Sequence, residues 1–582
     1  MTLLFSVFAF LFPLLYLPVT SEFYQFNKQW LLIFTSFTAL IIYLFSLTRH
    51  KKITIRLTAL DIPLLLLVFS FVLSTIFTAS NKYQAISSPI GTLTLVSLFI
   101  LYFLLKHIEK KEPVFISLII GTLILSLLSL LSIKGNWTPT GSPFISFEII
   151  TVIAVMLLTS FWKLLSEKFN FSMIVHIVLL AGLLPGFLIF LYAVVNQSHP
   201  PILPAIYGWN IITEVIRSPL NFFLGVGPGN FFNAFTMGKP VSYNLTPYWM
   251  ASFNYSSNVF FHLLSETGIL GFVSYLYLIL ILIKNTFFSD KNEEKPFYIG
   301  LLVLFLLQMR FPPDISTFIL LFMTVAMLDV PLARKFEYRF RYRAVPWAIL
   351  GLGTLVTLSL FYLVGRNFLA DLYFKKSLDG YLAEKGQEVY NNQIISLKLN
   401  PFSSRTHIAF SRINLDLAKS ISGKEKMDAS DKESMNKAVQ TAINEAKTAI
   451  SLDPSSAEAW NNLASIYRDI TNFAQGALDW TLAAYEKTIT LDPGNPLPRL
   501  NLGGVYYFIG KYSEAESLFR QAVKLKPDWA NFHFNLSLAL EAENKLPEAM
   551  SEIETTLRLL NPGSPDYIKA ASVSARLKEA TP

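Results

Sequence analysis

Three polar side chains recur at helical spacing where an apolar segment begins, near residue 258. Asn258, His262 and Glu266 follow one another at intervals of four residues, which places them on one face of a helix. An imidazole beside a carboxylate can act as a general base toward a hydroxyl group. Such groups are costly in an apolar helix unless they face a cavity or a partner, so this polar stripe is a candidate catalytic site. The competing interpretation is a set of hydrogen bonds that only hold neighbouring helices together.

A glycine-rich segment precedes the polar stripe. Residues 224–231 read LGVGPGNF, and alternating glycines let a backbone turn sharply or approach another group closely. The spacing fits neither a dinucleotide-binding turn nor a Walker A loop, because no buried strand precedes it and no Gly-Lys-Ser/Thr follows. We expect Gly225, Gly227, Gly229 and Asn230 either to contact a substrate or to form a structural turn.

Cations that can hold an anionic substrate are few near these motifs. Arg217, Lys239 and Arg310 are the outer-side cations near the motifs. Arg217 can equally be a surface cation on the amphipathic stretch 209–217. The chain has no cysteine, which excludes thiolate metal sites.

The elements that must position these residues are long apolar runs. The chain has 582 residues, of which 53% are hydrophobic, and a mean hydropathy of +0.45. A soluble protein of this length is less apolar. A bilayer core about 30 Å thick requires about 20 apolar residues in a helix. Eleven segments are candidate spans: 3–20, 29–47, 60–79, 90–106, 114–133, 144–162, 173–195, 258–283, 297–310, 314–331 and 345–364.

Lysine and arginine alternate between successive loops, which predicts the orientation. Five loops, at 49–56, 106–111, 163–168, 284–295 and 334–343, hold 17 of these residues. The alternate loops hold six: Lys28, Lys82, Lys134, Arg217, Lys239 and Arg310. The N-terminus is therefore expected in the cytoplasm, with the long loop 196–257 and the C-terminal tail outside. Basic loops explain the net charge of +8, so we expect no nucleic-acid partner.

The tail, residues 365–582, has an internal period near 34 residues. Prolines at 493 and 527 mark one period, and the unit between them carries large residues on its first helix and small ones where two helices would touch. Its signature residues are Leu502, Gly503, Tyr506, Ala515, Phe519 and Ala522. The pattern resembles the tetratricopeptide repeat. Such repeats stack into a superhelix that binds a peptide or partner protein, and a rigid spacer is the alternative role.

Together, the glycine-rich segment and the polar stripe resemble a known family. The order Gly-x-Gly-x-Gly-Asn-Phe, an outer loop, and then Asn258 with Leu264, Glu266, Gly268 and Gly271 is similar to the O-antigen ligase and polymerase superfamily, which includes protein O-oligosaccharyltransferases. The detailed resemblance covers residues 205–285, and several members carry C-terminal tetratricopeptide repeats.

The resemblance implies a glycosyltransferase in the inner or plasma membrane. The donor would be a glycan on a polyprenyl-diphosphate carrier, and the acceptor a lipid, a glycan or a protein on the outer side. A loop histidine beside the asparagine would activate the acceptor, and neither a metal nor a cofactor is implied. Outer arginines would hold the diphosphate, because guanidinium groups match it better than ammonium groups do. We rank Arg217 and Arg310 first for this role and Lys239 third. The predicted fold is all-α: a polytopic bundle over residues 1–364, followed by a tetratricopeptide superhelix over 365–582.

Two positions depart from the family pattern. Ser257 stands where the family usually has histidine, and Ala205 where it often has an arginine before Trp209. His262 can supply the imidazole one turn further along. Two hypotheses follow: a transferase with Asn258, His262 and Glu266 as catalytic residues, or an inactive relative that is a membrane-anchored scaffold for cell-envelope partners. A transporter is a weaker third, because few charged residues lie within the spans.

Overall fold

The computed structural model describes residues 1–132, 137–165, 168–196, 201–288, 293–328, 332–471 and 474–580. The loop cations Lys134 and Lys291, the ends of the predicted spans at 133 and 329–331, and residues 197–200 of the predicted outer loop lie outside the described residues. The chain divides into two compact units. The first comprises 1–208, 215–231 and 254–400, and the second comprises 209–214, 232–253 and 401–582.

The first unit is a helical bundle in which a helix overlaps each of the eleven expected spans, although α1 covers only the first half of the expected span 3–20. The helices are α1 (Thr2–Leu11), α2 (Gln25–His50), α3 (Asp61–Phe77), α5 (Thr92–Lys106), α6 (Glu112–Ser132), α7 (Pro143–Leu164), α8 (Phe171–Val195), α12 (Val259–Phe288), α13 (Lys295–Gln308), α14 (Ile315–Met327) and α15 (Ala344–Leu382). Seven helical stretches in the described part of the chain are long and apolar enough to cross a membrane, one of them being Lys82–Lys106, which ends with α5. Helices α1, α3, α13 and α14 are apolar but shorter, and their crossing stays a prediction.

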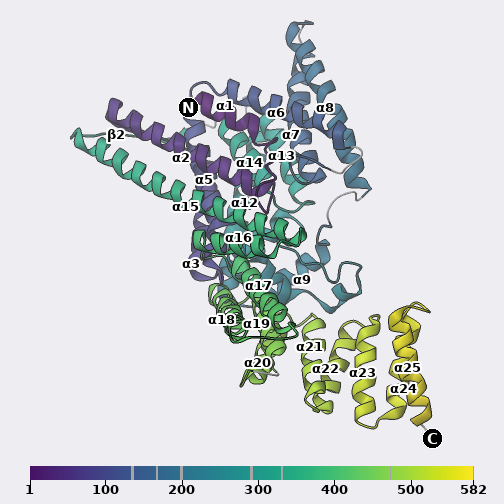
Figure 1. Ribbon diagram of the computed structural model, residues 1–582. Helices are drawn as coiled ribbons and strands as arrows, with labels where there is room; N and C mark the ends of the chain where they lie inside the picture. Colours follow the sequence, from purple (N-terminus) through teal and green to yellow (C-terminus); the bar gives the residue numbers. More distant parts are fainter. Residues whose placement is uncertain are drawn as a thin grey trace. The chain divides into compact units, whose positions relative to one another are not determined.

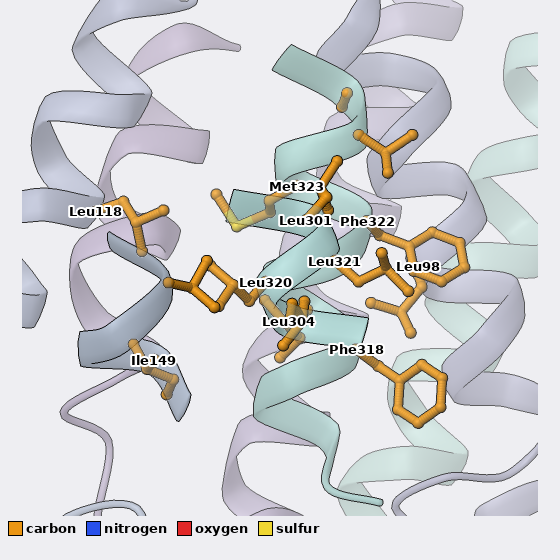
Figure 2. Close-up of a cluster of buried hydrophobic side chains, with 14 of the residues drawn as sticks. Leu98, Leu118, Ile149, Leu301, Leu304, Phe318, Leu320, Leu321, Phe322 and Met323 are labelled. Carbon is orange, nitrogen blue, oxygen red and sulfur yellow. The ribbon is translucent and has the colours of Figure 1, made fainter. Parts of the chain in front are cut away.

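Helix α14 forms the centre of this bundle. Its sequence ISTFILLFMTVAM is apolar on all sides, and such a helix must be covered on all sides. Every residue from Ile315 to Met327 is buried. Figure 2 shows Phe318 and its neighbours on α14 among side chains such as Leu98 of α5 and Leu304 of α13.

Shorter elements complete the first unit. They are α4 (Lys82–Ser87), α10 (Pro219–Leu224) and α16 (Gly386–Leu399), which packs against the end of α15. The expected boundary at 364/365 falls inside α15, because that helix continues to Leu382. The expected all-α class is incomplete in one respect: β1 (Lys52–Thr58) and β2 (Leu332–Arg339) form a two-stranded antiparallel sheet. The helix-centred sequence prediction missed these strands because both lie in charged loops.

The second unit stacks paired helices, as the 34-residue period predicts. The helices are α17 (Ser404–Ser422), α18 (Ala429–Leu452), α19 (Ala457–Ile470), α20 (Ala477–Leu491), α21 (Leu497–Phe508), α22 (Tyr512–Leu525), α23 (Ala530–Ala542), α24 (Leu546–Leu559) and α25 (Pro565–Ala580). Helices α21 to α25 lie side by side (Figure 1). A Cβ on Gly503 would lie 2.6 Å from the Phe519 ring, which confirms that a small residue is needed where α21 meets α22.

The second unit also contains part of the predicted outer loop. Helix α9 (Ala205–Val215) contributes residues 209–214. The segment 232–253 contains α11 (Phe231–Gly238) except its first residue, and the 3-10 helix η1 (Val241–Leu245). This unit is therefore built from two regions that lie far apart in the sequence.

Candidate functional site

The glycine-rich segment and the polar stripe meet within the first unit. The Val226 N–H donates to the Ser265 carbonyl at 2.9 Å, and the Gly227 N–H donates to the Glu266 carbonyl at 3.0 Å. The Phe231 N–H donates to Glu266 Oε1 at 3.2 Å. Two motifs separated in the sequence thus form one backbone junction at the start of α12.

Glycines on both sides make this junction possible. Gly225 has φ +68°, and a Cβ there would lie 2.3 Å from the Glu266 carbonyl carbon. Gly268 has φ +63° and interrupts the helical dihedrals of α12, and its Cβ would lie 2.4 Å from the Phe223 carbonyl carbon. Each glycine packs against backbone beside the other, so the two chain segments cross in direct contact.

The other residues of the glycine-rich segment fix the turn. A Cβ on Gly227 would lie 2.5 Å from Ala79, and one on Gly229 would lie 2.7 Å from the Ser88 hydroxyl. Asn230 Oδ1 accepts from the Asn81 N–H at 3.1 Å, and its Nδ2 donates to the Pro228 carbonyl at 2.9 Å. The close approach that the sequence predicted is therefore made to the protein itself. Direct contact of these glycines and Asn230 with a substrate stays a prediction.

The polar stripe lies on one helical face, and its members have different surroundings. Asn258 Oδ1 accepts from the Phe261 N–H at 2.8 Å and so caps the start of α12. His262 and Glu266 side chains are each 1% exposed, with Nε2 and Oε2 3.1 Å apart. The pair does not form a hydrogen bond, and neither ring nitrogen of His262 has a hydrogen-bond partner among the described residues. A buried polar group left without a partner is costly, which favours a functional role over a purely structural one.

Aromatic rings connect His262 to a second polar group. The Phe231 and Tyr255 ring centroids lie 5.8 and 5.6 Å from that of His262. The Tyr255 hydroxyl donates to Gln25 Oε1 at 3.2 Å, at the start of α2. Burial of that hydroxyl raises its pKa well above 10, and the charges of nearby carboxylates, including Glu266, raise it further.

A buried lysine interacts with two carboxylates, Glu22 and Asp314, that also act on this tyrosine. Lys28 is fully buried, and its Nζ has no hydrogen-bond partner in the part of the chain that the structure describes. Lys28 interacts electrostatically with Asp314 and Glu22. Burial raises the pKa of the Glu22 carboxyl, against hydrogen bonds from backbone N–H groups that lower it. The sequence analysis counted Lys28 only as a loop cation. Its position at the start of an apolar helix could have indicated a functional role.

The three cations expected to hold a diphosphate are divided between the units. Arg217 and Arg310 are exposed residues of the first unit, and the Arg310 guanidinium lies 5.9 Å from the Phe311 ring centroid. Lys239 belongs to the second unit, where its Nζ lies 3.0 Å from Asp492 Oδ1. A role for Lys239 in substrate binding stays a prediction, and a bound substrate would have to displace Asp492 from the lysine. No group of three or more metal-ligating side chains occurs among the described residues.

The segment 232–253 binds the repeats at successive helix ends. Asn233 Nδ2 donates to the Asp453 carboxylate at 3.1 Å, directly after α18. Asn244 Nδ2 donates to the Gly494 carbonyl at 2.8 Å, after α20. The Trp249 and Trp529 ring centroids are 5.1 Å apart, just before α23. The contact requires that the loop and the repeats lie on the same side of a membrane, as the alternation of basic loops predicts.

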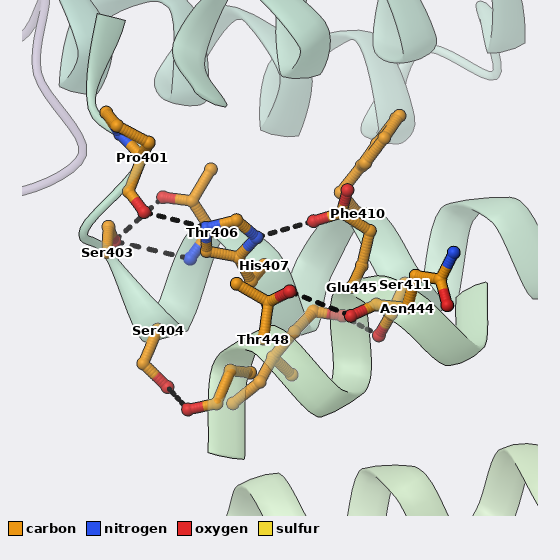
Figure 3. Close-up of polar contacts among 12 residues, drawn as sticks. Pro401, Ser403, Ser404, Thr406, His407, Phe410, Ser411, Asn444, Glu445 and Thr448 are labelled. Carbon is orange, nitrogen blue, oxygen red and sulfur yellow. Dashed lines mark hydrogen bonds and ion pairs between the residues drawn. The ribbon is translucent and has the colours of Figure 1, made fainter. Parts of the chain in front are cut away.

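Two histidines of the repeats share one arrangement. Figure 3 shows His407 between Glu445 and the Pro401 carbonyl. In the same way, His533 Nδ1 lies 2.6 Å from Glu552, and its Nε2 lies 2.8 Å from the Pro527 carbonyl. Both ring nitrogens face acceptors, which favours the doubly protonated ring. Burial lowers the pKa of each histidine, but the hydrogen bonds to these acceptors outweigh it and raise the pKa above 6.5.

The repeats are therefore expected to be more stable at pH 6 than at pH 8. Because the pKa of His407 and His533 is raised in the folded state, their stabilisation is complete below the unfolded value of about 6.5 and is lost as the pH rises through the folded value. Hydrogen exchange of α17 and α23 in the full-length protein measures this effect. The double substitution His407→Gln/His533→Gln should remove the pH dependence, and an unchanged dependence would contradict the assignment.

Comparison with known proteins identifies the repeats. Two tetratricopeptide repeat family models match residues 435–496 and 472–533. Over 81 residues the chain is 32% identical to the protein O-mannosyl-transferase TMTC1 of Mus musculus. This stretch covers 14% of the chain and spans only 9% of that relative's length.

Solved structures are similar over short parts of the chain. A tetratricopeptide-repeat protein of Thermus thermophilus is 18% identical and covers 35% of this chain and 97% of its own, with a TM-score of 0.27. Pseudomonas aeruginosa PilF is 15% identical and covers 37% and 90%, with a TM-score of 0.28. The family models and the seven long apolar helices identify the chain as a multi-pass membrane protein with C-terminal tetratricopeptide repeats.

Proposed function

We propose that the chain is a membrane glycosyltransferase. It would transfer a glycan from a polyprenyl-diphosphate carrier to a lipid, glycan or protein acceptor on the outer side of the membrane. The observation that carries this proposal is the junction in which Glu266 binds the glycine-rich segment and faces His262. The match to a protein O-mannosyl-transferase over 81 residues supports a glycosyl-transfer role in general.

In this mechanism His262 is the general base. Its ring takes the proton from the acceptor hydroxyl as that oxygen attacks the anomeric carbon of the donor glycan. The bond from that carbon to the phosphate oxygen breaks, and the polyprenyl diphosphate leaves with the bonding electrons. Glu266, 3.1 Å from Nε2, would stabilise the imidazolium that forms. A positioned general base typically contributes about 10²–10⁴-fold to the rate.

The diphosphate requires cations. Arg217 and Arg310 remain our first candidates, and Lys28 joins them because it is a buried ammonium without a hydrogen-bond partner in the described residues. The proposal also includes the topology on which the chemistry depends. The four shorter helices cross the membrane together with the seven long ones, the N-terminus is cytoplasmic, and the repeats lie outside. There the repeats would bind a peptide segment of a partner protein.

The second candidate is an inactive scaffold that presents the repeats to cell-envelope partners. Two observations favour it. Ser257 occupies the position of the expected family histidine and donates a hydrogen bond to the Pro204 carbonyl at 3.2 Å. His262 is 1% exposed, which is low for a residue that must meet a substrate.

Complementation of a deletion strain separates the two functions. We expect deletion to remove a glycan product and wild type to restore it. His262→Ala should lower the product by about 10²–10⁴-fold at equal protein level, because the general base is lost. The matched control is His176→Ala on α8, a histidine that is not part of the polar stripe. Its Nε2 is hydrogen-bonded to the Ser160 hydroxyl at 3.1 Å. Mass spectrometry of the glycans and an immunoblot of the membranes are the measurements.

Each result of this experiment decides something. If His262→Ala restores the product as fully as His176→Ala, the assigned site is wrong. If deletion changes no glycan, the transferase proposal fails and the scaffold is favoured.

A further inference from the structure

The two strands of the first unit combine two basic loops. Strand β1 follows α2 after a single residue, and β2 ends shortly before α15 begins. Lys52 pairs with Arg339, and Arg56 pairs with Lys335. The Phe340 N–H donates to the Lys51 carbonyl at 2.9 Å and extends the pairing by one residue. We call these strands with their flanking residues, 49–58 and 332–343, the basic ribbon.

The two faces of the basic ribbon differ in chemistry. Side chains alternate between the faces of a strand, and paired residues share a face. Ile53 pairs with Tyr338, Ile55 with Phe336 and Leu57 with Arg334, so one face is apolar and aromatic, with a single cation at one end. Phe336 and Tyr338 are 51% and 63% exposed. The apolar face is thus not covered by the rest of the unit.

The opposite face carries cations that repel one another. Arg56 lies directly opposite Lys335, and Lys52 lies directly opposite Arg339. Like charges at such positions destabilise strand pairing. Glu337 offsets part of the repulsion, because its carboxylate lies 3.1 Å from Lys52 and 3.5 Å from Lys335.

The whole basic ribbon has a large excess of cations. It contains nine Lys and Arg residues against one acid, Glu337. The strand pairing therefore retains a repulsion that an anionic partner would relieve.

The position of the basic ribbon indicates what kind of anionic partner it contacts. Helices α2 and α15 are both candidate membrane spans, and they pack together through Phe37 and Val364. Figure 1 shows the ends of these helices adjoining β2. The ribbon thus lies where two spans leave the apolar layer, the depth at which lipid headgroups occur. Basic segments next to a span are attracted to anionic lipids.

We propose that the basic ribbon binds the headgroups of anionic phospholipids. The aromatic face lies at the boundary of the acyl chains, and the long Lys and Arg side chains reach the lipid phosphates beside it. Arg56, Lys335 and Arg339 are the central cations. This binding is independent of the glycan chemistry proposed above.

Lipid binding to the purified full-length protein tests the proposal. The protein is held in a neutral detergent and titrated with phosphatidylglycerol or phosphatidylcholine, and bound lipid is counted by native mass spectrometry. We expect wild type to bind phosphatidylglycerol at least about tenfold more tightly, since each cation near a headgroup layer contributes substantially. Arg56→Gln/Lys335→Gln/Arg339→Gln should abolish this preference. The variant should still fold, because it removes like-charge pairs.

Control variants distinguish lipid binding from a general charge effect. Lys432→Gln/Lys437→Gln/Lys487→Gln removes three exposed cations from the repeats and should retain the preference. Glu337→Gln should strengthen it. Equal affinity for the two lipids, or a preference retained by the ribbon variant, overturns the proposal. Competition by excess soluble glycerol phosphate would also overturn it, because the ligand would then be a free phosphate and not a lipid.

Discussion

Gly268→Ala is expected to prevent accumulation of the folded protein. A Cβ at this position would lie 2.4 Å from the Phe223 carbonyl carbon and 2.5 Å from the Leu224 nitrogen. Both atoms are backbone and cannot move aside as a side-chain tip can. The dihedrals φ 63° and ψ −162° are also unfavourable for any residue with a Cβ. Strain and overpacking together should cost at least about 3 kcal/mol.

The size of this effect reflects the reciprocal contact at the junction. Gly225→Ala should be as harmful, because its Cβ would lie 2.3 Å from the Glu266 carbonyl carbon. The Ser74 hydroxyl donates to that carbonyl at 2.7 Å, which ties α3 to the same point. Moving the glycine-rich segment away from α12 to make room for a Cβ would therefore break these hydrogen bonds.

The matched control is Gly351→Ala in α15. Gly351 is helical, and a Cβ there would meet nothing within 4 Å. Alanine favours a helix over glycine by about 1 kcal/mol, so this variant should be at least as stable as wild type. Monodisperse yield by size-exclusion chromatography and the thermal unfolding midpoint are the measurements. A Gly268→Ala protein with a wild-type yield and midpoint would contradict the junction geometry.

The sequence predicted most of the elements because membrane spans and repeats have strong periodic signals. Each expected span overlaps a helix, and the repeat pattern around Gly503 and Phe519 is confirmed by the packing of α21 against α22. These signals are local, since each depends on residues within about one helix or one repeat.

The partners of the site residues were not predictable in the same way. The glycine spacing indicated a close approach, but only the fold shows that Gly225 approaches Glu266. The Tyr255 hydroxyl donates to Gln25 of α2, from the other end of the membrane half. A contact between distant segments leaves no periodic trace in a single sequence. The basic ribbon was missed for the same reason, because each strand gains its hydrogen bonds only from the other.

Lys239→Ala is expected to release the segment 232–253 from the repeats. The Lys239 ammonium lies 3.0 and 3.2 Å from the two Asp492 oxygens, and the two side chains are 7% and 6% exposed. Loss of the cation leaves a buried carboxylate without its charge partner, which typically costs about 3–5 kcal/mol. Asn495 Nδ2, 2.9 Å from the same carboxylate, still donates one hydrogen bond, so we expect the lower end of this range.

Hydrogen exchange in the full-length protein measures this release. A cost of about 3 kcal/mol corresponds to about a hundredfold faster exchange of the segment 232–253. The exposed Lys487→Ala is the control and should leave the exchange unchanged. The exchanged pair Lys239→Asp/Asp492→Lys should restore much of the protection, because it re-forms the ion pair with the charges reversed. Protection that survives Lys239→Ala would mean that Asn233, Asn244 and Trp249 hold the segment alone, and that the ion pair adds little to the contact between loop and repeats.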